Sequence, residues 1–160
     1  MSLFPIISPV SIVGYRYLRI TVTANVDSSY ADIREMKWFV DTTDYPTEAM
    51  TANDAPSPLV ASARGEALGG GGEAYRAYDN GTVIWADDQG SLPSWLKIDL
   101  GAGNEIDPTS CKITGSAGYN RSPIDFLLEG SNDDSDWTTL KDVSSESGWS
   151  SGEERTYTIP

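Results

Sequence analysis

Apolar and polar residues alternate with a period of two along most of the chain, and this pattern limits the fold more than any other feature. In the stretch 17–23, for example, Leu18, Ile20 and Val22 alternate with polar residues. Similar short apolar patterns occupy the stretches 36–40, 96–100, 111–114, 126–129, 137–140 and 155–159. Successive side chains of a β-strand point to opposite faces, so each stretch predicts a half-buried strand. Because Gly-, Pro-, Asn- and Ser-rich turns separate them, we expect an all-β sandwich or barrel.

The length of 160 residues fits one domain, which we expect to span residues 1–160. Residues 1–14 are expected to form an arm before the first strand. The segment 42–72, rich in Ala, Pro, Thr and Gly, is expected to be a long loop that wraps the sandwich or carries function. A helical turn around Glu48 to Thr51 is the alternative within it.

No stretch approaches the roughly 20 apolar residues of a membrane helix, so we expect no membrane insertion. The first 13 residues also lack the basic start and the small-residue cleavage site of a signal peptide.

The charges and the missing side chains exclude several classes of function. With 24 acidic and 11 basic residues, the formal net charge is -13, which argues against a nucleic-acid partner. The chain has no histidine and one cysteine, Cys111, which excludes a histidine-based catalytic triad, the usual zinc sites and an internal disulfide. No nucleophile and base pair can be assembled, so we expect no enzyme. Carboxylates, carbonyls and hydroxyls remain, and these suit a hard cation or a sugar.

Several motifs, taken in order, carry a resemblance to a known family. They are Ala77-Tyr78-Asp79, then Trp85, then Trp95 to Gly101 (WLKIDLG), then Asp125 to Asp133 (DFLLEGSND), then Trp137. In this order and spacing they resemble the discoidin, or coagulation factor 5/8 type C, family of the galactose-binding-like superfamily, which is similar to carbohydrate-binding module family 32. The resemblance implies a discoidin-type jelly-roll β-sandwich.

Two further motifs match the family in a different order. Tyr15 to Ile20 (YRYLRI) and Ile33 to Phe39 (IREMKWF) look like the last strands of the family, yet they come first in this chain. This order resembles a circular permutation, as in discoidin-like modules of phage structural proteins. A sandwich tolerates permutation because the ends of a domain often lie close together.

The resemblance also implies a structural cation, usually calcium. The positions that correspond to the family's ligands are the carboxylates of Asp79 and Glu35, the main-chain carbonyls of Arg76, Gly81 and Arg34, and the nearest hydroxyl, Thr82. Calcium suits such a set because it takes 6 to 8 oxygen ligands in flexible geometry. The alternative is a plain Asx-type turn at Asp79 with an empty or sodium-filled site.

The candidate ligand site lies in the loops, because a sugar site needs an aromatic face together with Arg, Asn or Asp side chains. The tryptophans that fall at core or near-core positions of the family are Trp38, Trp85, Trp95 and Trp137. The remaining candidates are Tyr119, Asn120 and Arg121, with Trp149, Tyr75, Asp87 and Asp88 as weaker additions. An ordinary loop role is the alternative for each of them, and Trp149 is also a candidate packing anchor. Family members often bind galactose with a histidine, so its absence weakens the inference of galactose.

The sequence thus predicts a non-catalytic module that binds a glycan or another cell-surface ligand, with calcium stabilising one end. The alternative is a structural or adhesion protein of a virion or surface assembly that contacts other virion proteins and forms homo-oligomers. Both place the protein in a virion or at an extracellular surface.

Overall fold

The computed structural model describes residues 14–27, 29–67, 71–116 and 121–160, and in them the predicted all-β class is confirmed. In chain order the elements are β1 (Tyr17–Ala24), β2 (Asp32–Val40), β3 (Thr43–Tyr45), β4 (Val60–Ala63), the short 3₁₀ helix η2 (Ala74–Tyr78), β5 (Trp85–Ala86), β6 (Ser94–Asp99), β7 (Ser110–Gly115), β8 (Asp125–Ser131), β9 (Thr138–Val143) and β10 (Glu154–Thr158). The expected arm, apart from Gly14, lies outside the described residues. Over the described ranges, no helix has the length and apolarity to cross a membrane.

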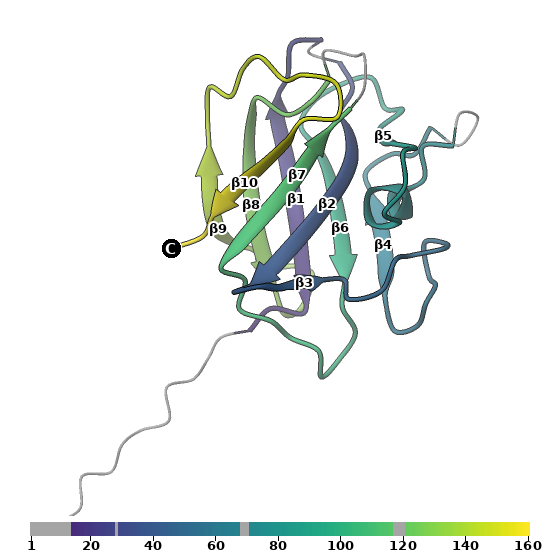
Figure 1. The fold of residues 1–160 in the computed structure, drawn as a ribbon, viewed down its shortest axis with the longest axis vertical. Coiled ribbons are helices and arrows are strands. Elements are labelled where there is room, and N and C mark those ends of the chain that lie inside the picture. The colour runs from purple at the N-terminus through teal and green to yellow at the C-terminus, as the bar shows by residue number, and fades with distance from the viewer. Residues whose placement is uncertain (1–13, 28, 68–70, 117–120) are drawn as a thin grey trace, which may run out of the picture.

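The strands form two antiparallel sheets that face each other (Figure 1). One sheet has the order β4-β6-β1-β8-β9, and the other has the order β10-β7-β2-β3 with β5 also paired to β2. The first two strands of the chain therefore occupy inner positions, β1 between β6 and β8, and β2 between β7 and β3. Strands from the start of the chain complete sheets that are built largely from its second half.

The core follows the predicted alternation. Leu18, Ile20 and Val22 on β1 are all completely buried. Trp38 and Trp85 are the largest of the fully buried side chains, which agrees with the expected core positions. Trp95 and Trp137 are half-buried, each beneath a basic side chain from β6 or β1.

The segment 42–72 is not the long loop that we expected. It contains β3, which pairs with β2, and β4, which pairs with β6, so it supplies an edge strand to each sheet. The alternative of a helical turn around Glu48 to Thr51 is also wrong. Instead, the Met50 N–H donates to the Tyr78 carbonyl at 2.9 Å, and the Met50 side chain is buried. Strands of three and four residues are too short to display a clear period of two.

The strand register brings four connections to one end of the sandwich, which we call the loop end. The residue pairs that fix this end are Val22 with Ser94, Ala24 with Asp125, Ile33 with Gly115, Thr114 with Glu154, and Phe126 with Val143. The connections that meet there are 25–31, 87–93, 116–124 and 144–153.

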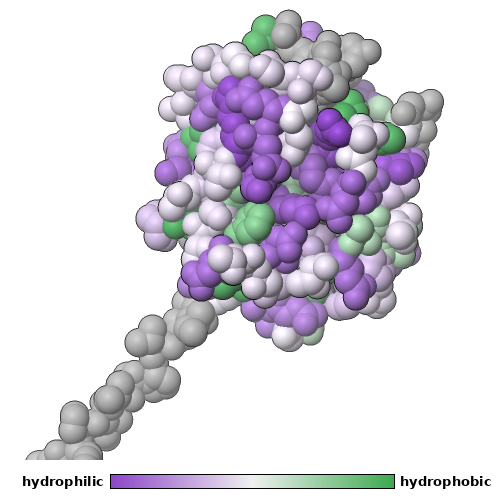
Figure 2. All heavy atoms as spheres, in the orientation of Figure 1, coloured by the Kyte–Doolittle hydropathy of each residue, from purple (hydrophilic) through white to green (hydrophobic). Residues whose placement is uncertain are grey.

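The outward face of β2, β7 and β10 is largely hydrophilic (Figure 2). It carries ion pairs between Lys37 and Asp44 at 2.8 Å and between Lys112 and Glu154 at 3.0 Å. These partly exposed, paired charges are typical of a sheet surface in contact with solvent, and the same face also carries a hollow beside Glu35.

Candidate functional site

Arg121 is the predicted ligand residue that the structure places at the centre of the loop end. Its Nε donates to Asp27 Oδ2 at 2.7 Å, and its guanidinium lies over the Tyr30 ring, 4.8 Å from the centroid. Asp27 and Tyr30 belong to the β1–β2 connection, whereas Arg121 comes from the β7–β8 connection. Asn25 links the two connections, since its side-chain amide donates to the carbonyls of Tyr30 and Arg121. The Arg121 side chain is 31% exposed, so a cation and an aromatic ring together face the solvent here.

Asp32, the first residue of β2, lies behind Arg121 and is completely buried. Its Oδ2 is 3.8 Å from Arg121 Nη1, and no hydrogen-bond donor among the described residues reaches either carboxylate oxygen. Burial raises the pKa of Asp32 to about 6, the Arg121 charge lowers it, and the charges of Asp27 and Asp87 raise it further. A buried carboxylate of this kind is costly, and perturbed carboxylates gather at functional sites.

Asp87 and Asp88, the weaker candidates, differ in their surroundings. Asp87 is 2% exposed, forms an ion pair with Arg64 at 3.2 Å and accepts a hydrogen bond from the Gln89 N–H at 2.9 Å. Asp88 is exposed beside it. The Asp87 carboxylate packs against the backbone of Gly65. Any larger residue at position 65 would clash with it, because an added Cβ would lie 2.3 Å from the carboxylate oxygen. Asp87 therefore organises the loop end from inside, and only Asp88 is open to a ligand.

Trp149 is half-buried and has the contacts of a packing anchor. Its Nε1 donates to the Pro123 carbonyl at 2.8 Å, which ties the β9–β10 connection to the connection that carries Arg121. One side of the Trp149 ring packs against Gly115, where even an added Cβ would lie only 2.7 Å from the ring. The Arg155 guanidinium also lies over the Trp149 ring, 4.2 Å from its centroid. Trp149 thus supports the loop that carries Arg121.

The remaining predicted ligand residues do not join this group in the described structure. Tyr75 lies in η2 on the flank of the sandwich, where its N–H donates to Asn53 and Arg76 lies over its ring. Tyr119 and Asn120 lie outside the described residues.

The predicted cation site lies on that flank, where η2 packs against β2. Asp79 follows η2 directly, and its Oδ1 accepts a hydrogen bond from the Gly81 N–H at 2.6 Å, as in an Asx-type turn. Its Oδ2 is 3.3 Å from Arg76 Nη1. Glu35 stands at an irregularity in the β2–β7 pairing, and its Oε2 is buried with no hydrogen-bond partner in the described chain. Burial raises the pKa of Glu35 to about 8, and the nearby negative charge of Asp79 adds to the rise.

The other predicted cation ligands are distributed around a surface hollow of about 300 Å³ beside Glu35. Arg34 and Gly81 line this hollow, whereas Thr82 is exposed and is not among its lining residues, and the Arg76 side chain pairs with Asp79 instead. The sequence did not point to three further lining residues that carry oxygen, namely Asn80, Thr114 and Glu154. Thr114 and Glu154 come from β7 and β10, so only the sheet pairing brings them here.

The chemistry of this hollow fits a hard cation. Burial and the negative charge of Asp79 raise the pKa of Glu35, the positive charges of Lys37 and Arg34 lower it, and one Glu35 oxygen is buried with no hydrogen-bond donor among the described residues. A dication would offset the nearby negative charge and satisfy the buried oxygen, and main-chain and hydroxyl oxygens would complete its coordination. The described residues contain no group of three or more Asp, Glu, His or Cys side chains suited to a metal. The carboxylates in and beside the hollow are those of Glu35, Glu154 and Asp79.

The comparisons with known proteins assign the family. The F5/8 type C family model of NedA-like, galactose-binding domains matches residues 77–160, just over half of the chain. The chain belongs to this family. The match begins at Ala77, where the first motif of the sequence resemblance begins, and it includes β5 to β10. The predicted galactose-binding-like sandwich is thereby confirmed. Comparison with the curated proteins and with the solved structures gives no match.

Family membership gives the function at a coarse level. A galactose-binding-like domain binds carbohydrate or a comparable ligand and is generally non-catalytic. The four strands before the match, β1 to β4, belong to the same two sheets as the matched strands.

Proposed function

We propose that this domain is a non-catalytic module that binds a glycan at its loop end. The observation that carries the proposal is the arrangement around Arg121, whose guanidinium is held between two carboxylates and against the ring of Tyr30. Arginine donates to sugar oxygens, exposed carboxylates such as Asp27 accept from sugar hydroxyls, and an aromatic ring packs on the apolar face of a sugar. Without a histidine, the site supports a glycan ligand in general rather than galactose in particular.

A glycan array with the domain displayed in multiple copies tests this proposal, since multivalent display raises weak single-site affinity. We expect binding to at least one class of glycan, and roughly tenfold weaker binding by Arg121→Ala, because a charge-assisted hydrogen bond is lost. Lys112→Ala, which removes one positive charge from the outer sheet face, is the matched control and should bind as the wild type does. No binding to any glycan, or unchanged binding by Arg121→Ala, would overturn the proposal.

We also propose that calcium occupies the flank site, held by Asp79 and Glu35 with main-chain oxygens of Arg34, Arg76 and Gly81. The unpartnered Glu35 oxygen and the nearby negative charge of Asp79 support this. The ion would join η2 to β2, and its role would be structural.

The second candidate function is a structural or adhesion protein of a virion or surface assembly. Its support is the order of the sequence motifs, in which YRYLRI and IREMKWF come first and resemble the family's last strands, as in permuted modules of phage structural proteins. This function predicts that the purified domain self-associates, which light scattering coupled to size exclusion measures. A monomer at all concentrations tested would contradict it and leave glycan binding as the role at the virion or extracellular surface.

A further inference from the structure

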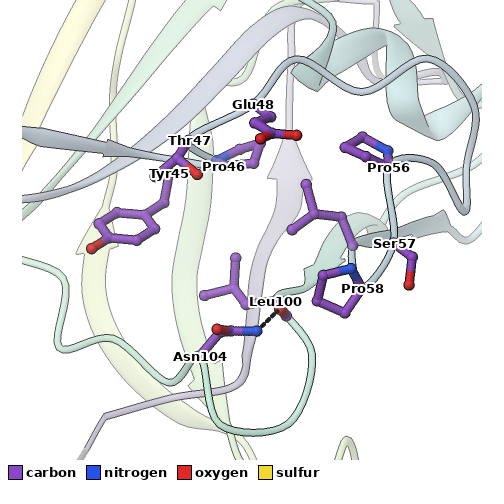
Figure 3. A pocket seen from close by; sticks show the side chains of 10 residues that line it. Tyr45, Pro46, Thr47, Glu48, Pro56, Ser57, Pro58, Leu100 and Asn104 are labelled. Atoms are coloured by element: carbon purple, nitrogen blue, oxygen red, sulfur yellow. Dashed lines mark hydrogen bonds between the residues drawn. The ribbon is translucent and has the colours of Figure 1, made fainter.

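A pocket lies at the end of the sandwich opposite the loop end, outside the two sites described above. Figure 3 shows it between Pro46 and Glu48 on one side, Pro56 and Pro58 on another, and Leu100 with Asn104 below. Its volume is about 210 Å³. We call it the end pocket.

The end pocket suits an apolar segment of polypeptide better than a free small molecule. Its walls include three prolines and two leucines, and Glu48 is its one charged lining residue. Pockets for drug-sized ligands usually have volumes of about 300 to 1,000 Å³, so this pocket accommodates one or two side chains. The Asn104 amide is already used, since its Nδ2 donates to the Leu100 carbonyl at 3.0 Å.

The start of the described chain is fixed beside this pocket. Tyr15 and Ile106 exchange main-chain hydrogen bonds of 2.7 and 3.1 Å. Arg16 forms a bidentate ion pair with Asp99, with both distances 2.7 Å, and its carbonyl accepts from the Leu100 N–H at 3.0 Å. A Cβ on Gly14 would lie 3.0 Å from Glu105. Residue 13 therefore joins the described chain next to the 100–106 connection, which supplies one wall of the pocket.

The residues that precede this point have the composition that the pocket would accept. Residues 1–13 (MSLFPIISPVSIV) contain no charged side chain, so all 35 charged residues of the chain, 11 basic and 24 acidic, lie in residues 14–160. Eight of the 13 are large apolar residues. Leaving so many apolar side chains in water is unfavourable, at roughly 25 cal/mol per Å² of apolar surface.

We propose that segment 1–13 of the same chain docks in the end pocket and inserts apolar side chains between the prolines and Leu100. An extended chain covers about 3.3 Å per residue, so a few residues before Gly14 are enough to reach the pocket. The tether also gives the segment a high effective concentration at the pocket, which favours the same chain over a second copy.

Disulfide trapping in the full chain tests the proposal. Ser8→Cys places a thiol in the segment, and Ser57→Cys places one on the exposed rim of the pocket, while the native Cys111 is buried and stays out of the reaction. The matched control combines Ser8→Cys with Ser135→Cys, an exposed position outside the pocket. Ser135 lies in the β8–β9 connection, which is also close to the start of the described chain because Asn132 donates to the Gly14 carbonyl at 2.9 Å. We expect the first pair to give an intramolecular disulfide in at least roughly tenfold higher yield than the control under the same oxidation, because docking concentrates the two thiols. Equal yields from the two pairs, or disulfide-linked dimers as the main product, would overturn the proposal.

A second measurement avoids new cysteines. In the full chain, Ile6→Ser combined with Ile7→Ser should shift the NMR signals of the Leu59 and Leu100 amides and of the Asn104 side chain. The Trp149 indole signal at the loop end should stay unchanged, which reports that the fold is intact. Unchanged signals from all the pocket residues would overturn the proposal, and neither experiment depends on glycan or calcium binding.

Discussion

Removing divalent cations with EDTA is expected to lower the Tm of this domain, and an excess of calcium is expected to raise it again by about 5 to 10 °C. A ligand that binds only the native state at about 100 times its Kd stabilises that state by about 2.7 kcal/mol. For a domain of this size, each kcal/mol corresponds to about 2 to 4 °C in Tm. The stabilisation has a physical source in the flank site, where the half-buried Glu35 lies near Asp79 and one buried Glu35 oxygen is unpartnered. Differential scanning calorimetry at constant pH measures the shift.

Asp79→Asn separates the cation from the turn. An asparagine keeps the side-chain oxygen that accepts from the Gly81 N–H, so the local turn is retained. It removes the negative charge, so the response to calcium should disappear while the Tm in EDTA changes little. Asp136→Asn, which neutralises an exposed carboxylate in the β8–β9 turn, should leave the calcium response intact. If calcium does not shift the wild-type Tm, Asp79 is a turn residue only and the cation proposal is wrong.

The parts of the fold that the sequence predicted are those with a strong local signal. The alternation of Leu18, Ile20 and Val22 identified β1 and its buried face, because one strand face repeats every second residue. The spaced motifs from Ala77 onward led to the family that the family model then matched. In contrast, β4 has only four residues, and its assignment as a strand depends on pairing with β6, which no local pattern reveals.

The candidate site was less predictable because its contacts are distant in sequence. Arg121 was identified as a loop residue, but its partner Asp27 is 94 residues away. Asp32 carries no motif of its own, since only the tertiary fold places the first residue of β2 behind Arg121. The sequence left Trp149 as either a ligand residue or a packing anchor. Its hydrogen bond to the Pro123 carbonyl and its packing on Gly115 support the packing anchor.

Asp32→Asn is expected to stabilise the domain at pH 7 by about 2 to 3 kcal/mol. The pKa of Asp32 is about 6 in the folded state, compared with 3.8 as its ordinary value, chiefly because the carboxyl is buried. One pKa unit corresponds to about 1.4 kcal/mol, and the Asp32 side chain is completely buried, so solvent screening reduces the effect little. An asparagine of nearly the same shape removes the buried charge, while Arg121 keeps its ion pair with Asp27.

The direction of the pH dependence follows from proton binding. Below about pH 4 the carboxyl is protonated in both the folded and the unfolded state, so the substitution should have little effect there. Between about pH 4 and pH 6 the unfolded state loses its proton first, so the wild type loses stability as the pH rises. Above pH 6 both states are ionised, and the full difference between wild type and variant remains. Urea unfolding from pH 4 to pH 8 measures it, with Asp142→Asn, at an exposed position, as the control that should follow the wild type.

The same substitution should weaken glycan binding, because the Asp32 charge helps to hold the Arg121 guanidinium in place. A variant that gains stability and loses affinity would mark Asp32 as a residue retained for binding at a cost to the fold, as is common at functional sites. Two results would argue against this. Parallel stability curves for wild type and variant would show that burial does not govern the pKa of Asp32, and stabilisation with unchanged glycan affinity would show that Arg121 is positioned without it.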